Sequence, residues 1–302
     1  ANIIHIKTRS GMYMKNVPYY LNEDLAWLLG MIATDGNIKL VKSKQRGETT
    51  RIRIFNTNLL ILEKVKNICT KYFENLCISD HSSLNSVQPC YEYSFSSAFF
   101  TEICNYYGIS TSCKTYSVRA LNFENTSPSV VASYLAGVID GDGNYSKKGN
   151  LIRILTASVE YSRDLIKLFK LIGVSSRITL VSSEKIKLRP SYDPSKIASA
   201  VDTYFVNVSS QSDLDFFISQ SKNYSVKTQH TSNASITNVK RSPEKIMTII
   251  EQEVENYNTL NFSVLDNNNY YVNNVLTHNC GRSGRSGKDA HCYLLYNAKD
   301  KN

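Results

Sequence analysis

Two aspartates stand at matching ends of two similar segments and are the strongest candidates for chemistry in this sequence of 302 residues. Asp35 ends the apolar stretch 25–35, Asp142 ends the similar stretch 131–142, and Gly-Asn follows both. Adjacent carboxylates repel unless a cation lies between them. Such hard oxygen ligands suit Mg²⁺, which binds substrate phosphate and assists phosphodiester cleavage. One copy alone would favour a simple Asp-Gly turn, but the duplication favours a shared catalytic site.

Two closely packed helices would be needed to bring these aspartates together. Small residues allow helix backbones to approach more closely than the usual spacing of about 8–10 Å. Glycine costs about 1 kcal/mol inside a helix, so its presence there needs a reason. We expect the two segments to pack against each other through Gly30, Ala33, Ala136, Gly137 and Gly141.

Further matches extend this internal repeat. The expected strand Arg51-Ile-Arg-Ile-Phe55 matches Leu151-Ile-Arg-Ile-Leu155, and helical patterns follow at 58–73 and 162–172. Each copy closes with a third match, Lys114-Thr-Tyr-Ser-Val-Arg119 against Lys222-Asn-Tyr-Ser-Val-Lys227. Each copy therefore predicts helix, strands, helix, strands, helix, and the pair predicts an α/β pseudo-dimer with internal two-fold symmetry.

The second copy carries a recognisable motif. Leu135-Ala-Gly-Val-Ile-Asp-Gly-Asp-Gly143 resembles the name motif of the LAGLIDADG homing endonucleases and differs from it at two positions, whereas Leu28–Gly36 is looser, with Ala33 where an acid often stands. The resemblance implies a single-chain α+β fold of two αββαββα-type units acting as a monomer on double-stranded DNA. It also implies Mg²⁺-dependent cleavage of both strands across the minor groove, leaving short 3′ overhangs. The metal ligands would be Asp35 and Asp142, with the backbone of Gly36 and Gly143 as further candidates.

Basic residues in this family assist the water nucleophile or neutralise developing charge. Lys114 and Lys222 fall at the matching places, and Lys227 and Arg119 are close rivals for the role. The alternative for each is an ordinary solvated side chain.

The charge of the chain also indicates a polyanionic partner. The net charge is +9 and the pI is near 9.0, and residues 1–128 and 129–228 each carry +4. Arginine suits guanine readout and lysine suits phosphate neutralisation. The expected DNA contacts are Arg51, Arg53 and Arg153 on strands, and Lys39, Lys42, Lys44, Arg46, Lys147 and Lys148 in loops.

An acidic segment after the repeat resembles the C-terminal splicing junction of an intein. Residues 260–279 show a hairpin pattern and end in His278-Asn279, followed by Cys280. Asn279 would cyclise and cut the chain, His278 would protonate the departing amine, and Cys280 would accept the upstream chain as a thioester. Asn268 and Asn261 replace the usual His and Asp, and no N-terminal splicing block is visible. We therefore do not expect self-splicing, although slow cleavage after Asn279 stays open.

The last segment differs again. Gly281-Arg-Ser-Gly-Arg-Ser-Gly-Lys-Asp-Ala-His291 resembles the last conserved motif of RecQ-like helicases, in which Arg282 and Arg285 would contact ATP phosphates. A flexible basic tail is the alternative. The resemblance implies an intein inserted in a host helicase, the extein, and the intein-free allele of that helicase gene as the DNA target.

These observations divide the chain into a linker (1–19), a first repeat (20–127), a second repeat (128–228), a splicing segment (229–279) and a helicase extein segment (280–302). Seven cysteines without a C-x-x-C pair, and no apolar run long enough to span a bilayer, predict an intracellular protein of the cytoplasm or nucleus without a membrane partner. A nuclease-inactive nucleic-acid-binding module or RNA maturase of the same fold stays open as the alternative function.

Overall fold

The computed structural model describes residues 3–7, 13–43, 47–80, 90–110, 114–146, 151–184, 201–229, 269–272 and 275–278. The chain divides into two compact units, Ala1–Val239 and Lys240–Asn302. The first unit contains both repeats. In the described residues no helix is long and apolar enough to cross a membrane.

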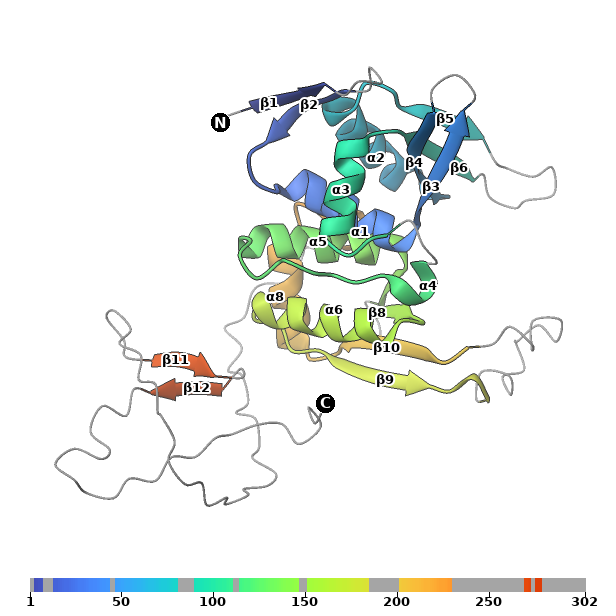
Figure 1. Ribbon diagram of the computed structural model, residues 1–302. Coiled ribbons are helices and arrows are strands. Elements are labelled where there is room, and N and C mark those ends of the chain that lie inside the picture. Colours follow the sequence, from blue (N-terminus) through green and yellow to red (C-terminus); the bar gives the residue numbers. More distant parts are fainter. Residues whose placement is uncertain are drawn as a thin grey trace, which may run out of the picture. The chain divides into compact units, whose positions relative to one another are not determined.

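The two repeats have the same order of elements, as Figure 1 shows. The first consists of α1 (Glu23–Thr34), β3 (Gly36–Ser43), β4 (Gly47–Asn56), α2 (Leu59–Tyr72), β5 (Cys77–Asp80), β6 (Tyr91–Phe95), α3 (Ala98–Tyr106) and α4 (Lys114–Ser117). The second consists of α5 (Pro128–Gly141), β7 (Gly143–Ser146), β8 (Leu151–Thr156), α6 (Val159–Leu171), β9 (Arg177–Val181), β10 (Thr203–Val208), α8 (Gln211–Ser221) and α9 (Val226–Gln229). Both sheets are antiparallel, in the orders β3-β4-β6-β5 and β7-β8-β10-β9. The expected mixed α/β arrangement with antiparallel sheets is confirmed. In the described residues each repeat ends with a short helix, α4 or α9, beyond the expected αββαββα order.

Polar caps determine where the main helices begin. The side chains of Asn22, Asn58, Ser127 and Ser158 each accept a hydrogen bond from a backbone amide in the first turn of the helix that follows. Such a cap satisfies one of the amides that a helix start leaves without a partner. Ser158 explains why α6 begins at Val159, three residues before the expected start.

The stretch expected as a linker before the first repeat contains structure of its own. Strands β1 (Ile3–Lys7) and β2 (Tyr13–Pro18) pair antiparallel. Met14 forms an isolated bridge with Phe73 at the end of α2, and Met14 and Val17 are buried. This hairpin therefore contributes to the core of the first repeat.

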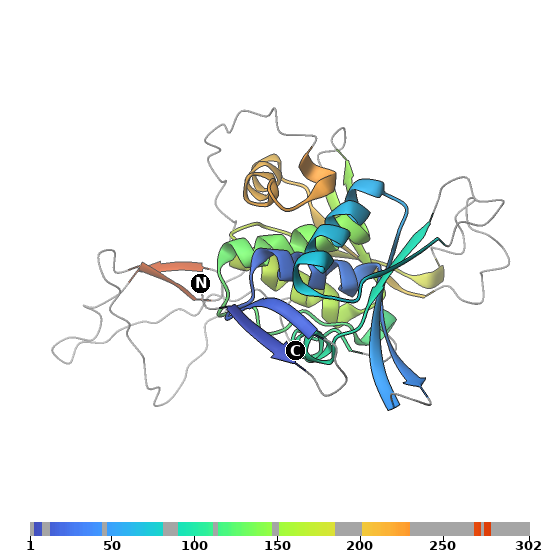
Figure 2. The same ribbon diagram turned by 90° about the horizontal axis from the view of Figure 1, so that it is seen from above.

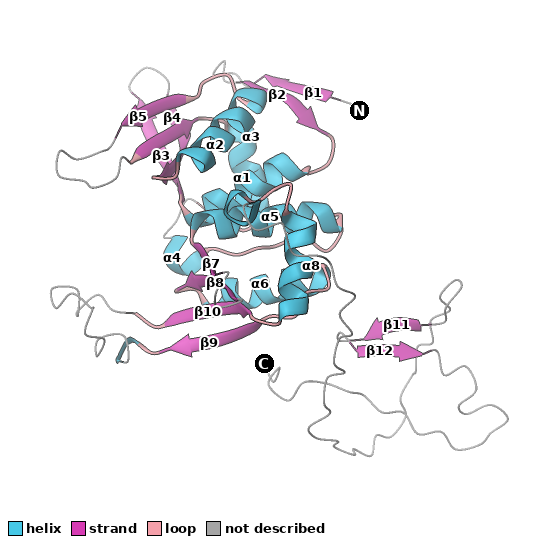
Figure 3. Cartoon of the chain, turned by 180° about the vertical axis from the view of Figure 1, so that it is seen from behind, coloured by secondary structure: helices cyan, strands magenta, loops and turns pink. Residues whose placement is uncertain are grey.

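Helices α1 and α5 lie side by side at the centre of the first unit, with one sheet on each side of them (Figures 1 and 3). A Cβ atom added at Gly30 would lie 2.2 Å from the carbonyl oxygen of Tyr134. At Gly137 it would lie 2.1 Å from the carbonyl oxygen of Trp27. Neither position has room for any side chain, so the two helices meet backbone to backbone, as the small residues predict.

Alternation along the strands separates an inner from an outer face of each sheet. Ile52 and Ile54 of β4, and Ile152 and Ile154 of β8, are fully buried and join the core. The residues between and beside them point to the opposite face, which carries the arginines. The view from above in Figure 2 shows the central helices with strands reaching out beyond them.

In the second unit the structure describes one antiparallel pair, β11 (Asn269–Val272) with β12 (Val275–His278). The hairpin expected before the splicing junction is therefore present, and His278 is its last residue. Asn279, Cys280, Asn261, Asn268 and the helicase-like segment lie outside the described residues.

Candidate active site

Asp35 and Asp142 are the C-cap residues of the two central helices α1 and α5. The close packing of these helices brings their C-terminal ends together: a Cβ atom at Gly141 would lie 3.6 Å from the carboxyl carbon of Asp35. Asp35 is partly buried and Asp142 is exposed. The structure thus brings the two predicted carboxylates to one place.

The electrostatics of Asp35 reflect this proximity. Burial, and after it the negative charge of Asp142, raises the pKa of Asp35 to about 6. A hydrogen bond from Asn56 and the charges of Lys227 and Lys114 oppose the rise in pKa. A carboxylate pair that repels itself in this way is a site that gains from a bound cation.

Two lysines anchor the ends of the central helices. Lys114 Nζ donates to the carbonyl oxygens of Ile32 (3.2 Å), Thr34 and Gly36 (2.5 Å). In the second repeat Lys227 Nζ donates to the carbonyl oxygens of Ile139 (3.0 Å), Gly141 (2.8 Å) and Gly143 (2.8 Å). Four of these carbonyls, on Ile32, Thr34, Ile139 and Gly141, are groups that a helix end leaves without partners. The two lysines therefore hold equivalent positions beside the two aspartates.

Burial lowers the pKa of both lysines. The pKa of Lys114 falls to about 8, while the charges of Asp142 and Asp35 oppose the fall. The pKa of Lys227 is lowered for the same reason, against the charges of Asp140, Asp35 and Asp142. Each ammonium group uses all three of its donors on carbonyl oxygens, which fixes its place.

Lys222, which the sequence match paired with Lys114, lies elsewhere. It is the C-cap residue of α8 and is exposed, and Lys227 occupies the place that corresponds to Lys114. A different match in the sequence would have found it: Ser112-Cys-Lys-Thr115 aligns with Ser225-Val-Lys-Thr228. Arg119, the other rival, is directed away from the site, because its guanidinium pairs with Asp164 at 2.6 Å.

Asn56, at the end of β4, was not predicted as a site residue. Its amide nitrogen donates to Asp35 Oδ2 at 2.7 Å, and its Oδ1 accepts from the backbone amide of Asn58 at 2.8 Å. Thr156 holds the same place in the second repeat, and its hydroxyl accepts from the amide of Ser158 at 3.0 Å. The hydrogen bond that forms the turn before α2 is thus matched by one before α6. The contact to a catalytic aspartate is made in the first repeat, from Asn56 to Asp35.

Asp140, the acid that precedes Asp142 by two residues, has a structural role. It is fully buried and accepts hydrogen bonds from Ser225 Oγ (2.9 Å), from the amides of Val226 (2.8 Å) and Lys227 (2.9 Å), and from Trp27 Nε1 (2.9 Å). Asp140 therefore fixes the start of α9, and with it the backbone of Lys227.

The donor set fits a hard divalent cation. Mg²⁺ is commonly bound by one or two carboxylates together with waters and substrate phosphates. Asp35 and Asp142 supply the carboxylates, and the described residues contain no group of three or more acidic, His or Cys side chains that could form an all-protein cage. The carbonyls of Gly36 and Gly143, the further ligand candidates, each accept from a lysine.

The predicted DNA contacts fall into four groups. Lys39 and Lys42, expected in loops, lie on strand β3 instead. Lys39, Arg51 and Arg53 share the outer face of the first sheet, since Lys39 pairs with Arg51 in the register and Arg53 follows two residues later. Arg153 lies on the outer face of the second sheet, whereas Lys42 lies, by alternation, on the side opposite Lys39. Lys44, Arg46, Lys147 and Lys148 are outside the described residues. Arg177, which sequence reasoning missed, is exposed on β9, and Arg153 and Arg177 flank Asn207 of β10 from its two neighbouring strands.

Comparison with known proteins supports the motif assignment in the second repeat. Residues 129–220 match the family model described as a LAGLIDADG-like domain, and Asp142 lies within this range. Among curated proteins none matches the chain. The second repeat is therefore similar to this family over most of its length.

Several solved structures match part of this chain at low sequence identity. The homing endonuclease I-DmoI in complex with DNA and Mn is 15% identical, over 67% of this chain and 97% of that chain, with a TM-score of 0.43. The homing endonuclease I-WcaI bound to its DNA recognition sequence is 13% identical, over 70% and 87%, with a TM-score of 0.43. Full-length DUF199/WhiA from Thermatoga maritima is 15% identical, over 74% and 65%, with a TM-score of 0.42.

Proposed function

We propose that the repeated unit is a site-specific endonuclease that hydrolyses both strands of double-stranded DNA with the help of Mg²⁺. The observation that carries the proposal is the pairing of Asp35 and Asp142 at the adjacent C-terminal ends of α1 and α5. Two carboxylates that repel each other, one of them exposed, are suited to bind the cation and, through it, the scissile phosphates.

Each group of the chain has a definite task in this reaction. Asp35 and Asp142 hold Mg²⁺, which when bound stabilises the charge on the attacking and leaving oxygens. Lys114 and Lys227 supply fixed positive charge near the phosphates, because their donors are already used on carbonyl oxygens. Asn56 orients the Asp35 carboxylate. One aspartate and one lysine come from each repeat, which suits one set of groups to each DNA strand.

The outer faces of the two sheets bind the DNA on either side of the cleavage point. Lys39, Arg51 and Arg53 serve the first sheet, and Arg153 and Arg177 serve the second. The target is the intein-free allele of the host helicase gene, at the point that encodes the junction before Cys280. His278 and Asn279 end the C-terminal splicing segment of the same intein, and Cys280 begins the extein.

The test is cleavage of supercoiled plasmid carrying the rejoined helicase-coding sequence, in the presence of Mg²⁺. The wild-type protein should yield linear plasmid. Asp35→Asn and Asp142→Asn should each reduce linear product by at least about 1,000-fold, because the cation loses a ligand from one carboxylate, while binding to the DNA persists. Asp215→Asn on α8 is a matched control, since its remaining oxygen still accepts from Gln211.

The result that overturns the proposal is a folded wild-type protein that binds this DNA and cuts neither strand. Tight binding to RNA without DNA nicking would instead support the maturase alternative. Loss of residues 280–302 on long incubation, seen by mass spectrometry, would separately support cleavage at Asn279.

A further inference from the structure

The outer face of the first sheet contains a buried acid among its arginines. Glu92 of β6 is 3% exposed. Its carboxylate lies 3.7 Å from Arg51 Nη2 and accepts from Arg53 Nη1 at 3.4 Å. Arg51 also donates to Ser94 Oγ at 2.7 Å. Both guanidinium groups are therefore held against the sheet by the same carboxylate.

The second sheet has an aromatic ring in the equivalent place. Arg53 pairs with Ser94 in the register, and Glu92 lies two residues before Ser94. Arg153 pairs with Asn207, and Phe205 lies two residues before Asn207. Arg153 stacks over the Phe205 ring at 5.0 Å and donates to Asn207 Oδ1 at 3.0 Å. Position by position, a carboxylate in the first repeat corresponds to a phenyl ring in the second.

This difference has a physical consequence for the arginines. A free arginine side chain has about 2 kcal/mol of rotamer entropy to lose when it is ordered. A buried carboxylate requires charged partners, so Arg51 and Arg53 are ordered before any ligand arrives. Each guanidinium has five N–H donors, and the contacts to Glu92 and Ser94 leave others for a ligand.

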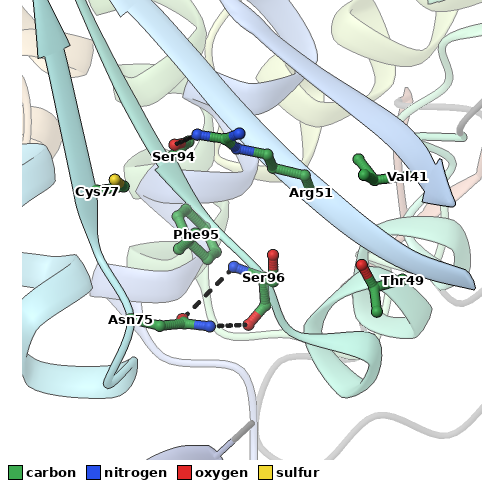
Figure 4. A pocket seen from close by; sticks show the side chains of 8 residues that line it. All are labelled: Val41, Thr49, Arg51, Asn75, Cys77, Ser94, Phe95 and Ser96. Atoms are coloured by element: carbon green, nitrogen blue, oxygen red, sulfur yellow. Dashed lines mark hydrogen bonds between the residues drawn. The ribbon is translucent and has the colours of Figure 1, made fainter. Parts of the chain in front are cut away.

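The surface beside Arg51 suits recognition of a specific ligand better than general attraction of a polyanion. A hollow of about 310 Å³ opens beside it, lined mainly by small side chains that carry no charge, including Thr49, Asn75 and Ser96. Figure 4 shows Arg51 reaching across this hollow toward Ser94, with Asn75 fixed by hydrogen bonds to the backbone of Ser96. Among the described residues of this lining, Arg51 is the one with a charged side chain.

We propose that Glu92 is a positioning residue for sequence recognition, and that it makes the first repeat the stricter reader of its half of the DNA site. Glu92 holds Arg51 and Arg53 in fixed directions and offsets part of their charge, so these arginines discriminate between bases more than they attract phosphate. In the second repeat Arg153 is held by Phe205 and Asn207, which carry no charge. No acid in this place offsets the charge of Arg153 or Arg177, so this repeat attracts phosphate more than it discriminates between bases and tolerates more sequences. The inference rests on the proposed function, because it assumes that these faces bind DNA.

The experiment is selection of bound duplexes from a pool with a randomised 30-base-pair segment, followed by sequencing, with Ca²⁺ in place of Mg²⁺ so that no DNA is cut. The wild-type protein should select a motif with one strict side and one permissive side. Glu92→Gln should flatten the strict side, where discrimination of about ten- to a hundredfold per arginine contact falls below about threefold. Its affinity for unselected duplex should rise about threefold, because two arginine charges are no longer offset.

Three variants sharpen the outcome. Arg51→Lys keeps the charge and loses the planar fork, and it should flatten the same side as Glu92→Gln. Arg153→Lys should affect the other side, and Glu102→Gln, which removes an exposed acid on α3, should change neither. A merely structural role of Glu92 would weaken both sides together.

The failures of the two proposals are distinguishable. If the wild-type protein selects no sequence, the proposed function and the inference both fail. If it selects a motif that Glu92→Gln and Arg51→Lys leave unchanged, the inference alone is overturned.

Discussion

The two repeats share a backbone and differ in the chemistry that stabilises it. Both have the same element order, the same sheet order and a glycine at the helix crossing. At the position two residues before the catalytic candidate, however, the first repeat has Ala33 and the second has Asp140. The two repeats have the same geometry where their backbones touch, and their side chains differ where other contacts replace one another.

The contacts between the repeats illustrate this divergence. Lys64 of α2 donates to the carbonyl oxygen of Tyr224, near the end of the second repeat. Counted from the caps Asn58 and Ser158, the residue equivalent to Lys64 is Asp164 of α6, which binds the closing segment of the first repeat through Arg119 (2.6 Å) and the amide of Ala120 (3.1 Å). Each repeat thus holds the end of the other, with opposite charges.

The largest difference between the repeats should appear at Asp140. Asp140→Ala removes the acceptor for Trp27 Nε1, Ser225 Oγ and two backbone amides, and should cost about 4 kcal/mol of the free energy of unfolding. Urea unfolding measures it. The reverse change, Ala33→Asp, should not stabilise the first repeat. A small loss of unfolding free energy for Asp140→Ala would show that the second repeat tolerates alanine at this position, as the first repeat does at Ala33.

The glycines at the crossing test what the repeats have in common. Gly30→Ala and Gly137→Ala each force a methyl group against a carbonyl oxygen of the other helix, and each should cost about 3 kcal/mol. Gly141→Ala is the comparison, because its methyl group meets the Oγ1 and Cβ atoms of the Thr34 side chain rather than a carbonyl oxygen of the other helix, and it should cost less, about 2 kcal/mol. Unequal losses at Gly30 and Gly137, measured by thermal unfolding, would contradict the symmetry of the pair.

Lys64 gives the contact between the repeats a pH dependence. Burial lowers its pKa to about 8, so between about pH 8 and 10.5 the unfolded chain binds a proton that the folded chain has released. The contribution of Lys64 to stability therefore rises with pH across this window. The difference in unfolding free energy between wild type and Lys64→Met should grow by about 2 to 3 kcal/mol from pH 7 to pH 10. A difference that stays constant between these pH values would show that burial does not lower the pKa of Lys64.

The smallest expected effect concerns Asn56 and Thr156. Asn56→Thr removes the hydrogen bond that lowers the pKa of Asp35, so this pKa should rise above about 6. At pH 6 the affinity for Mn²⁺, measured by calorimetry, should fall about threefold because more Asp35 is protonated. Thr156→Asn, the exchange in the opposite direction, should not weaken the binding. Equal effects of both exchanges would mean that the carboxylates are not distinguished by this contact.

Much of the fold was predictable because duplicated local patterns determine it. Caps, strand alternation and small residues at helical spacing all repeat, and the repeat itself indicated that Asp35 and Asp142 would meet. The packing at Gly30 and Gly137 followed from the absence of side chains.

The positions of the lysines near the end of each repeat, Lys114 and Lys227, and the side chains that contact the arginines were harder to predict. Equal spacing along the sequence favoured Lys222, but Asp140 anchors α9 five residues further on, so that Lys227 reaches the carbonyls. Glu92 and Arg177 gave no sequence signal, because their meaning depends on which residue faces them across the sheet. Register, which relates strands far apart in sequence, was the missing information.

The contact between α1 and α5 also has a consequence for how the chain folds during synthesis. Residues 25–33 of α1 are all buried, and much of their cover is α5, which begins at Pro128. Each sheet and its helices can form from local contacts, whereas the central contact must wait for distant parts of the chain to meet. We expect the nascent first repeat to expose an apolar helix until the second emerges, and to depend on chaperones during that interval.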